Sequence, residues 1–208
     1  MSGQTPPLVG IIGAGTIGRA MARHFVNAGC GVVLSNSRGP ESLGAAVEEL
    51  GGEDAGVFAG TTDEALAADI VVLSVPWQHL ETVLSEAPAW NGRIVVDVTN
   101  AIINPGFRIV DLGSRASSAV VADLVPGARL VKAGNTFAAT VLAQSPLSES
   151  GRRVFFLCGD DAAARKTVGG LMDAAGFAVV DLGTLADGAR LMQFPGGPLP
   201  GLDLIRPV

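Results

Sequence analysis

The chain of 208 residues is 48% hydrophobic and 16% charged, and its formal net charge is −6. A chain of this size and composition buries a sizeable core in one domain, or in one domain with a small appendage. Its acidic balance, with no basic run longer than Arg152-Arg153, argues against nucleic acid or an anionic membrane as a partner.

The opening residues and the two cysteines predict a cytoplasmic protein. Residues 1–7 lack the basic and apolar parts of a signal peptide, and no apolar run reaches the roughly 18 residues of a membrane span. Cys30 and Cys158 lie far apart, beside apolar residues and without metal-ligand spacing. We expect two buried free thiols, no disulfide and no metal site.

The pattern between residues 8 and 38 predicts a strand, a glycine turn, a helix and a second strand. Residues 8–12 are apolar, an amphipathic segment follows the turn as far as Gly29, and residues 32–34 form the next apolar run. The turn has the sequence GAGTIG, which matches the G-x-G-x-x-G fingerprint of dinucleotide-binding proteins. The residues expected to bind the dinucleotide here are Gly13, Ala14, Gly15, Thr16, Ile17 and Gly18.

The three glycines of the motif have separate expected roles. Gly13 permits the sharp turn, Gly15 lets the backbone approach a pyrophosphate, and Gly18 lets the helix pack close to the strand. The helix that begins near Thr16 directs its free N–H groups and its positive dipole end at the phosphates. The alternative is a purely structural glycine turn in another kind of α/β protein.

The residues after the second strand indicate NADP rather than NAD. NAD-binding proteins place Asp or Glu here for the ribose 2′-hydroxyl, whereas a 2′-phosphate needs small donors and a cation. This chain has the sequence SNSR at positions 35–38 and no carboxylate before Glu41. We expect Ser37 and Arg38 to bind the 2′-phosphate, and the alternative is a solvated polar loop.

Helices and strands continue to alternate through the first 125 residues. We expect a helix over residues 40–50, a strand at 56–59, and a short helix to about residue 68 that begins with the capping-box spacing of Thr61 and Glu64. Residues 69–75 and 91–98 are apolar and rich in β-branched side chains, as in buried parallel strands. The pattern predicts an α/β fold of the Rossmann type, with a doubly wound parallel sheet in the order 3-2-1-4-5.

The rest of the chain alternates less regularly. Helices are expected over residues 114–125, 137–144 and 161–175, the last capped by Asp160 or Asp161, and strands over 128–133, 154–158 and 177–182. The tail, rich in proline and glycine, is expected to be an ordered loop packed by Leu199, Leu202, Leu204 and Ile205. We divide the chain into an NADP-binding domain (1–125) and a small C-terminal α/β extension (126–208) that completes the sheet and covers the reaction site.

Three loops bring polar groups to the carboxyl ends of strands, where open α/β sheets bind ligands. They are residues 75–79, 97–100 and 132–136. The residues of these loops that we expect at the cofactor or acceptor are Pro76, His79, Asn135 and Thr136. His24 lies within the first helix and is expected to be structural.

Each polar residue of these loops also has a simpler interpretation. His79 could instead be a solvated residue at the start of a helix. Asn135 and Thr136 could simply cap a helix. Lys132 lies inside a strand, so a structural or salt-bridge role has at least as much support as a catalytic role. For Asp97 we favour stabilisation of a turn over action as a general base. We therefore assign no catalytic residue.

The order of motifs along the chain carries a family resemblance. GAGTIG, SNSR, VPWQH, DVTN, KAGNT, CGDD and GARLMQF resemble the NADP oxidoreductases that depend on coenzyme F420, an 8-hydroxy-5-deazaflavin. The resemblance spans nearly the whole chain, and VPW-x-H with the serine-arginine pair is far more specific than the glycine motif. It implies a C-terminal portion that holds the deazaflavin against the nicotinamide, and a homodimer. The residues that it implies for NADP binding are Ala14, Gly15, Thr16, Ile17, Ser37, Arg38, Val75, His79, Asn100 and Ala139.

The chain departs from that family pattern at two neighbouring positions. Asn135 stands where members with established activity tend to carry histidine, and Gly134 stands where nearer relatives read KAFNT. We expect Gly134 to remove a bulky side chain beside the nicotinamide. A similar fold forms the cytoplasmic part of membrane metalloreductases that pass hydride to a flavin, so an ordinary flavin is an alternative acceptor.

The expected function is hydride transfer between NADP(H) and a deazaflavin or flavin-type small molecule. Such a transfer needs close stacking and orientation more than acid–base residues, in which the predicted site is poor. One alternative is an NADPH-dependent imine or carbonyl reductase related to the β-hydroxyacid dehydrogenases, which needs a positioned acid. The other is a non-catalytic NADPH-binding protein.

Overall fold

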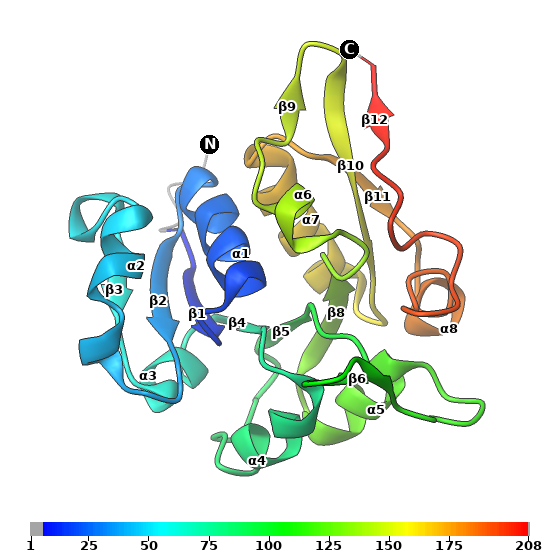
Figure 1. The fold of residues 1–208 in the computed structure, drawn as a ribbon, viewed down its shortest axis with the longest axis horizontal. Coiled ribbons are helices and arrows are strands. Elements are labelled where there is room, and N and C mark those ends of the chain that lie inside the picture. Colours follow the sequence, from blue (N-terminus) through cyan, green and yellow to red (C-terminus); the bar gives the residue numbers. More distant parts are fainter. Residues whose placement is uncertain (1–5, 208) are drawn as a thin grey trace.

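The computed structural model describes residues 6–207, so most of the opening segment considered above, residues 1–5, lies outside the described residues. Five parallel strands form the first half of the central sheet: β1 (Leu8–Ile12), β2 (Gly31–Ser35), β3 (Val57–Ala59), β4 (Ile70–Leu73) and β5 (Ile94–Asp97). They lie in the order β3-β2-β1-β4-β5, which confirms the predicted doubly wound arrangement (Figure 1).

The second half of the chain extends the same sheet. Strand β8 (Arg129–Ala133) pairs in parallel with β5, β10 (Gly151–Cys158) runs antiparallel to β8, and β11 (Ala178–Asp181) is parallel to β10. Two short strands, β9 (Leu147–Ser148) and β12 (Ile205–Arg206), pair with the outer end of β10. Residues on both sides of position 125 therefore share one sheet, and the division into two parts stays a prediction.

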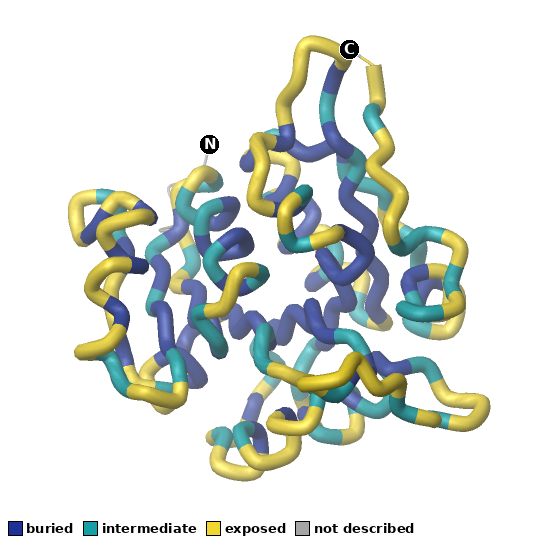
Figure 2. Tube along the Cα trace, viewed as in Figure 1, coloured by how far each residue is buried: buried dark blue, intermediate teal, exposed yellow. Residues whose placement is uncertain are grey.

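Helices cover both faces of the sheet. Those on one face are α1 (Thr16–Asn27), α2 (Gly44–Glu49), α6 (Ala139–Leu142) and α7 (Ala162–Ala174), and those on the other are α3 (Thr62–Leu66), α4 (Leu80–Ser85) and α5 (Ser117–Leu124). The central strands contribute to both apolar cores: Ile11 and Val72 pack on the α1 face, and Ile12 on the α3 face. Burial on both faces explains why these strands are continuously apolar (Figure 2).

Local signals in the sequence account for most helix ends. Thr61 and Glu64 form the predicted capping box of α3, and the Asp161 carboxylate accepts a bond from the Ala164 amide at the start of α7. The helix predicted over residues 40–50 is divided instead, because a 3₁₀ turn, η1 (Pro40–Ser42), precedes α2. The Ser42 hydroxyl donates to the Gly39 carbonyl, a local bond that competes with a regular helix.

The C-terminal tail is ordered, but two of its predicted packing contacts are wrong. Leu202 and Leu204 are each 42% exposed, whereas Leu199 packs on the cluster around Phe156. The tail is held largely by polar contacts: β12 pairs with β10, and the buried Arg153 guanidinium binds both carboxylate oxygens of Asp203. A short helix in this region, α8 (Leu185–Gly188), was not predicted.

The predicted structural residues lie in the interior. Cys30 and Cys158 are buried and free, and burial raises the pKa of the Cys158 thiol to about 12. His24 is buried as well, and its Nε2–H donates to the Leu142 carbonyl at 2.7 Å. No helix within residues 6–207 is both long enough and apolar enough to cross a lipid bilayer.

Candidate functional site

A cleft of about 780 Å³ lies at the carboxyl ends of β1, β2, β4 and β5. Its walls come from the glycine turn (residues 13–18), the loop after β2, and the loops that follow β4 and β5. This is the crevice at the point where the strand order reverses, between β1 and β4, and open α/β sheets bind ligands there. The predicted site residues that line it are Gly13, Gly15, Thr16, Ile17, Ser37, Val75, Pro76, His79 and Asn100.

The glycine turn shows a different requirement at each glycine. Gly13 has φ +106°, and a Cβ atom there would lie 2.4 Å from the Ser74 carbonyl oxygen. A Cβ atom on Gly18 would lie 1.8 Å from the Gly13 carbonyl oxygen, so helix and turn pack too closely for any side chain. A Cβ atom on Gly15 would meet no heavy atom within 4 Å. Gly13 and Gly18 are therefore required by the fold, whereas Gly15 leaves an open space that a ligand can use.

The start of α1 suits a phosphate group. Gly15 is its N-cap residue and provides no side-chain cap, and the first turn contains no acidic residue. The N–H groups of that turn and the positive end of the helix dipole therefore face the cleft without a competing carboxylate. Together with the open space at Gly15, this arrangement fits the pyrophosphate of a dinucleotide.

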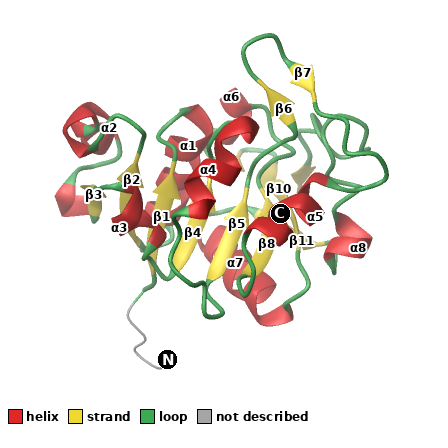
Figure 3. Cartoon of the chain, turned by 90° about the horizontal axis from the view of Figure 1, so that it is seen from below, coloured by secondary structure: helices red, strands yellow, loops and turns green. Residues whose placement is uncertain are grey.

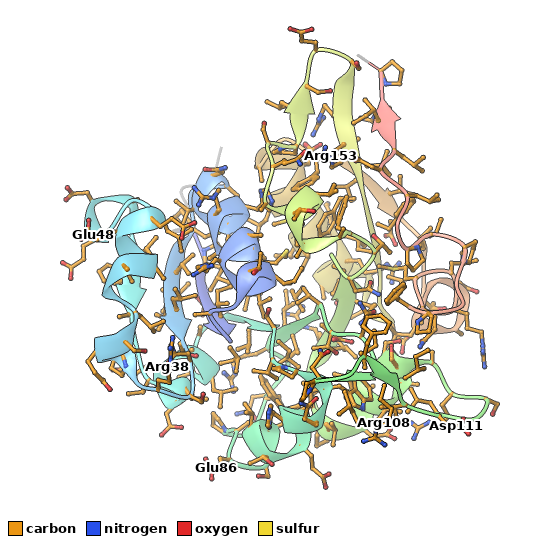
Figure 4. The ribbon with its side chains drawn as sticks, viewed as in Figure 1. Arg38, Glu48, Glu86, Arg108, Asp111 and Arg153 are labelled. Atoms are coloured by element: carbon orange, nitrogen blue, oxygen red, sulfur yellow. The ribbon has the colours of Figure 1, made fainter. Side chains whose placement is uncertain are left out.

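The loop after β2 is fixed by Asn36. Its side-chain oxygen accepts a bond from the Arg38 amide at 2.8 Å, and its amide nitrogen donates to the Ser42 hydroxyl at 2.9 Å. Ser37 lines the cleft, and the exposed Arg38 lies beside it at the end of β2 (Figure 4). A hydroxyl and a guanidinium with no carboxylate between them form the donor set that a 2′-phosphate requires.

The loop after β4 forms the next part of the wall. Val75 and Pro76 lead into a 3₁₀ turn, η3 (Trp77–His79), whose tryptophan packs on the α3-face core. That anchor leaves Pro76 and His79 exposed at the edge of the cleft. Gln78 points away toward the segment after β5, where its amide donates to the Asn104 carbonyl at 2.8 Å.

The loop after β5 is held by a buried network beneath the cleft. Asp97 accepts two bonds at Oδ1, from the Thr99 amide at 2.8 Å and the Thr99 hydroxyl at 2.7 Å. Its Oδ2 atom lies 3.0 Å from Nζ of Lys132, which also donates to the Thr99 carbonyl. The turn-stabilising role favoured for Asp97 is confirmed, and of the two roles left open for Lys132 the structure shows the salt bridge. The network fixes the loop that presents Asn100.

Asn135 lies behind Asn100 and connects it to the C-terminal segment. Its Nδ2 atom donates to Asn100 Oδ1 at 3.0 Å and to the Met192 carbonyl at 2.7 Å, and Asn100 Nδ2 donates back to the Asn135 carbonyl. Asn135 is buried and does not line the cleft. Its geometry suits a residue that orients Asn100 rather than one that reaches a ligand directly.

The other predicted contacts lie outside the cleft lining. Ala14 and Gly18 belong to the glycine turn, and the exposed Arg38 is next to Ser37 of the cleft lining. Thr136 is buried, and Ala139 is the first residue of α6 on the α1 face of the sheet. Their contact with a cofactor stays a prediction.

Gly134 differs from its expected environment. A Cβ atom there would lie 3.3 Å from Met21 Sδ, 3.5 Å from Val98 Cγ1 and 3.7 Å from the Phe155 ring, all core atoms. With its φ of +68°, Gly134 has a backbone conformation that favours glycine, and among these neighbours Val98 lines the cleft.

Sequence reasoning missed one part of the wall, a hairpin formed by β6 (Ile102–Ile103) and β7 (Arg108–Ile109). Ile102, Asn104 and Phe107 of this hairpin line the cleft. The sequence contained a signal for it, because the turn residues Asn-Pro-Gly at 104–106 separate the pair Ile102-Ile103 from the largely apolar segment FRIV at 107–110.

The comparisons with known proteins agree with this site. The family model described as "NADP oxidoreductase coenzyme F420-dependent" matches residues 8–101, which include the glycine turn, Ser37, Arg38 and the loops after β4 and β5. A solved structure from Arthrobacter sp. FB24, named as a candidate F420-dependent NADP reductase, is 26% identical with a TM-score of 0.71 and covers 89% of this chain and 88% of its own. Over residues 8–101 the chain is therefore similar to this family of NADP oxidoreductases.

Two further proteins are also similar to this chain. A hypothetical protein of Sinorhizobium meliloti, SMa0349, is 43% identical with a TM-score of 0.87, over 98% of this chain and 96% of that one. The metalloreductase STEAP3 of Rattus norvegicus is 31% identical over 93% of this chain. The chain spans 37% of the length of that metalloreductase.

Proposed function

We propose that this oxidoreductase transfers a hydride between NADP(H) and the planar ring of a deazaflavin or flavin. The observation that carries the proposal is the chemistry of the cleft: among the described residues that line it, His79 is the only titratable side chain. Reduction of a carbonyl or imine needs a positioned proton donor, whereas hydride transfer to a flavin-type ring needs mainly orientation. The lining of the cleft therefore supports a reaction in which the protein mainly orients the two rings.

The residues of the chain have distinct roles in this proposal. The first turn of α1 and the open space at Gly15 hold the pyrophosphate, and Ser37 with Arg38 hold the 2′-phosphate. Bound NADPH supplies the hydride from its nicotinamide ring. Asn100, oriented by Asn135 and by the loop bound to Asp97, lies at the nicotinamide end of the cleft. These groups bind and orient, and none of them has to exchange a proton.

Both relatives are named as reductases, and the name of one supports a deazaflavin acceptor. The Arthrobacter structure is named for a deazaflavin, coenzyme F420, and the rat protein is named as a metalloreductase. The rat protein is much longer than this chain, so its complete activity is not carried over. What the two names share is reduction, which supports the reductase part of the proposal.

An acceptor panel tests the proposal. NADPH oxidation is followed with an 8-hydroxy-5-deazaflavin, FMN, a cyclic imine and a small ketone, for the unmodified protein and for Gly15→Val, which is expected to lose all turnover. We expect turnover with at least one ring acceptor and none with the imine or the ketone. Turnover confined to the imine or ketone would contradict the proposal.

His79 provides a second test, because it is the one side chain of the cleft lining that is able to serve as an acid. We expect His79→Ala to lower kcat/KM about tenfold, the loss of one orienting contact worth roughly 1.4 kcal/mol. Complete loss of turnover with unchanged NADPH affinity would instead assign His79 as a catalytic acid. The carbonyl or imine reductase would then be the better assignment.

A further inference from the structure

Phe107 lies at the mouth of the cleft in an unusual setting. It lines the same cleft as Pro76 and Asn100, yet it is 57% exposed. Its φ of +52° is one of two positive values among the described non-glycine residues, and the other belongs to Asn91, a residue type that tolerates this conformation. An exposed phenylalanine in an unfavourable backbone conformation gains little from packing in the free protein. Such positions are characteristic of ligand sites.

The hairpin that carries Phe107 is fixed to both loops of the nicotinamide end. The Ile102 amide donates to the Asn100 carbonyl at 2.7 Å, and the Val110 amide donates to the Ala101 carbonyl at 2.9 Å. Gln78, from the loop after β4, binds the Asn104 carbonyl. The hairpin projects beyond the ends of the central strands (Figure 3). These bonds fix the hairpin whose turn places Phe107 in the cleft lining.

A second aromatic ring supports Phe107 from the other end of the chain. Phe194 meets it edge to face, with ring centroids 6.1 Å apart and planes inclined by 72°. Phe194 follows Met192, whose carbonyl accepts the bond from Asn135. The hairpin and the C-terminal segment therefore meet at the cleft mouth through two aromatic side chains, one of them still largely exposed.

We infer that Phe107 is a specificity-determining residue that contacts the planar aromatic ring of the second substrate, with Phe194 as its support. Aromatic side chains favour edge-to-face or offset contact with another aromatic ring, which removes their exposed carbon surface from water. A small aliphatic carbonyl or a hydrated ion would leave Phe107 exposed. The inference rests on the proposed function, which supplies the flavin-type ring as the ligand. It requires only that such a ring binds in the cleft beside Phe107.

Ring binding is measured without turnover, by quenching of riboflavin fluorescence on the protein saturated with NADP⁺. We expect Phe107→Ala to raise the riboflavin Kd about tenfold, the loss of one aromatic contact, and Phe107→Trp to bind about as well as the unmodified protein. The matched control is Phe58→Ala, which removes a ring of similar exposure, 43%, from the edge strand β3. Thermal unfolding of each variant confirms that it is folded.

The outcomes separate the inference from the proposed function. Phe107-dependent binding of riboflavin supports the inference whatever the acceptor panel shows, and absence of turnover with every ring acceptor of that panel then counts against the function alone. Equal riboflavin affinity in Phe107→Ala and the unmodified protein overturns the inference, as does failure of the unmodified protein to bind riboflavin at all. An equal loss of affinity in Phe58→Ala overturns it too, because the effect would not be specific to the cleft.

Discussion

The Nζ atom of Lys132 lies 3.0 Å from Oδ2 of Asp97, and these side chains are 1% and 0% exposed. Neighbouring strands bring them together, since Asp97 on β5 is in register with Lys132 on β8. The other carboxylate oxygen of Asp97 binds Thr99, so one buried ion pair determines the course of the loop that carries Asn100. Stability and site geometry therefore depend on the same two residues.

We expect Lys132→Met to destabilise the protein by about 3–5 kcal/mol, because it leaves the Asp97 carboxylate buried without its cation. Denaturant unfolding measures the change. Lys166→Met is the matched control, because Lys166 is exposed on α7, and it should change stability by less than about 0.5 kcal/mol. The double variant Asp97→Asn/Lys132→Met should recover part of the loss, and a single variant as stable as the unmodified protein would contradict this reading of the pair.

The glycine turn predicts opposite results for two neighbouring substitutions. Gly18→Ala should impair folding, because its Cβ atom would lie 1.8 Å from the Gly13 carbonyl oxygen. Gly15→Val should fold, since a Cβ atom there meets no heavy atom within 4 Å, but its side chain would occupy the position of the pyrophosphate. Thermal unfolding and NADPH titration distinguish the two. A Gly15→Val protein that binds NADPH normally would place the pyrophosphate elsewhere.

Arg38→Ala should remove most of the preference for NADPH over NADH. In the unmodified protein a charge-assisted bond from Arg38 to the 2′-phosphate is expected to contribute roughly 1.5–3 kcal/mol. Calorimetric titration with both nucleotides gives the preference directly. Arg23→Ala serves as control because Arg23 binds Glu49 on the outer side of α1, away from the cleft lining. Equal affinities of the unmodified protein for the two nucleotides would refute the assignment of this loop.

His24 predicts part of the pH dependence of stability. Burial lowers the pKa of His24 below its ordinary value of about 6.5, so the unfolded chain takes up a proton at that pH before the folded protein does. The contribution of His24 to stability is therefore complete above about pH 7 and falls as the pH decreases toward the lowered pKa. His24→Gln should show a smaller loss of unfolding free energy between about pH 7 and pH 5 than the unmodified protein, measured by denaturant unfolding at both pH values. An unchanged slope in His24→Gln would contradict the prediction.

The sequence predicted the central sheet well because its signals are local. Strands buried on both faces are continuous apolar runs, and the spacing of Gly13, Gly15 and Gly18 follows from the geometry of a single turn. The link from Asn135 to Asn100 joins residues 35 positions apart, and the meeting of Phe107 with Phe194 joins more distant ones, so neither leaves a local pattern. Leu202 and Leu204 were misjudged because apolar composition does not reveal that the tail is held by strand pairing and by Arg153.

Deuterium at C4 of the NADPH nicotinamide gives the most direct test of hydride transfer between two rings. In the proposed reaction the C4–²H bond breaks with its electron pair, a C5–²H bond forms on an 8-hydroxy-5-deazaflavin, and water supplies the proton that N1 takes up. With the two C4 epimers of deuterated NADPH, mass spectrometry should find one deuterium in the reduced deazaflavin from one epimer and none from the other. A reduced product that carries only protium from both epimers, or no reduction of any ring acceptor, would contradict direct hydride transfer in this cleft.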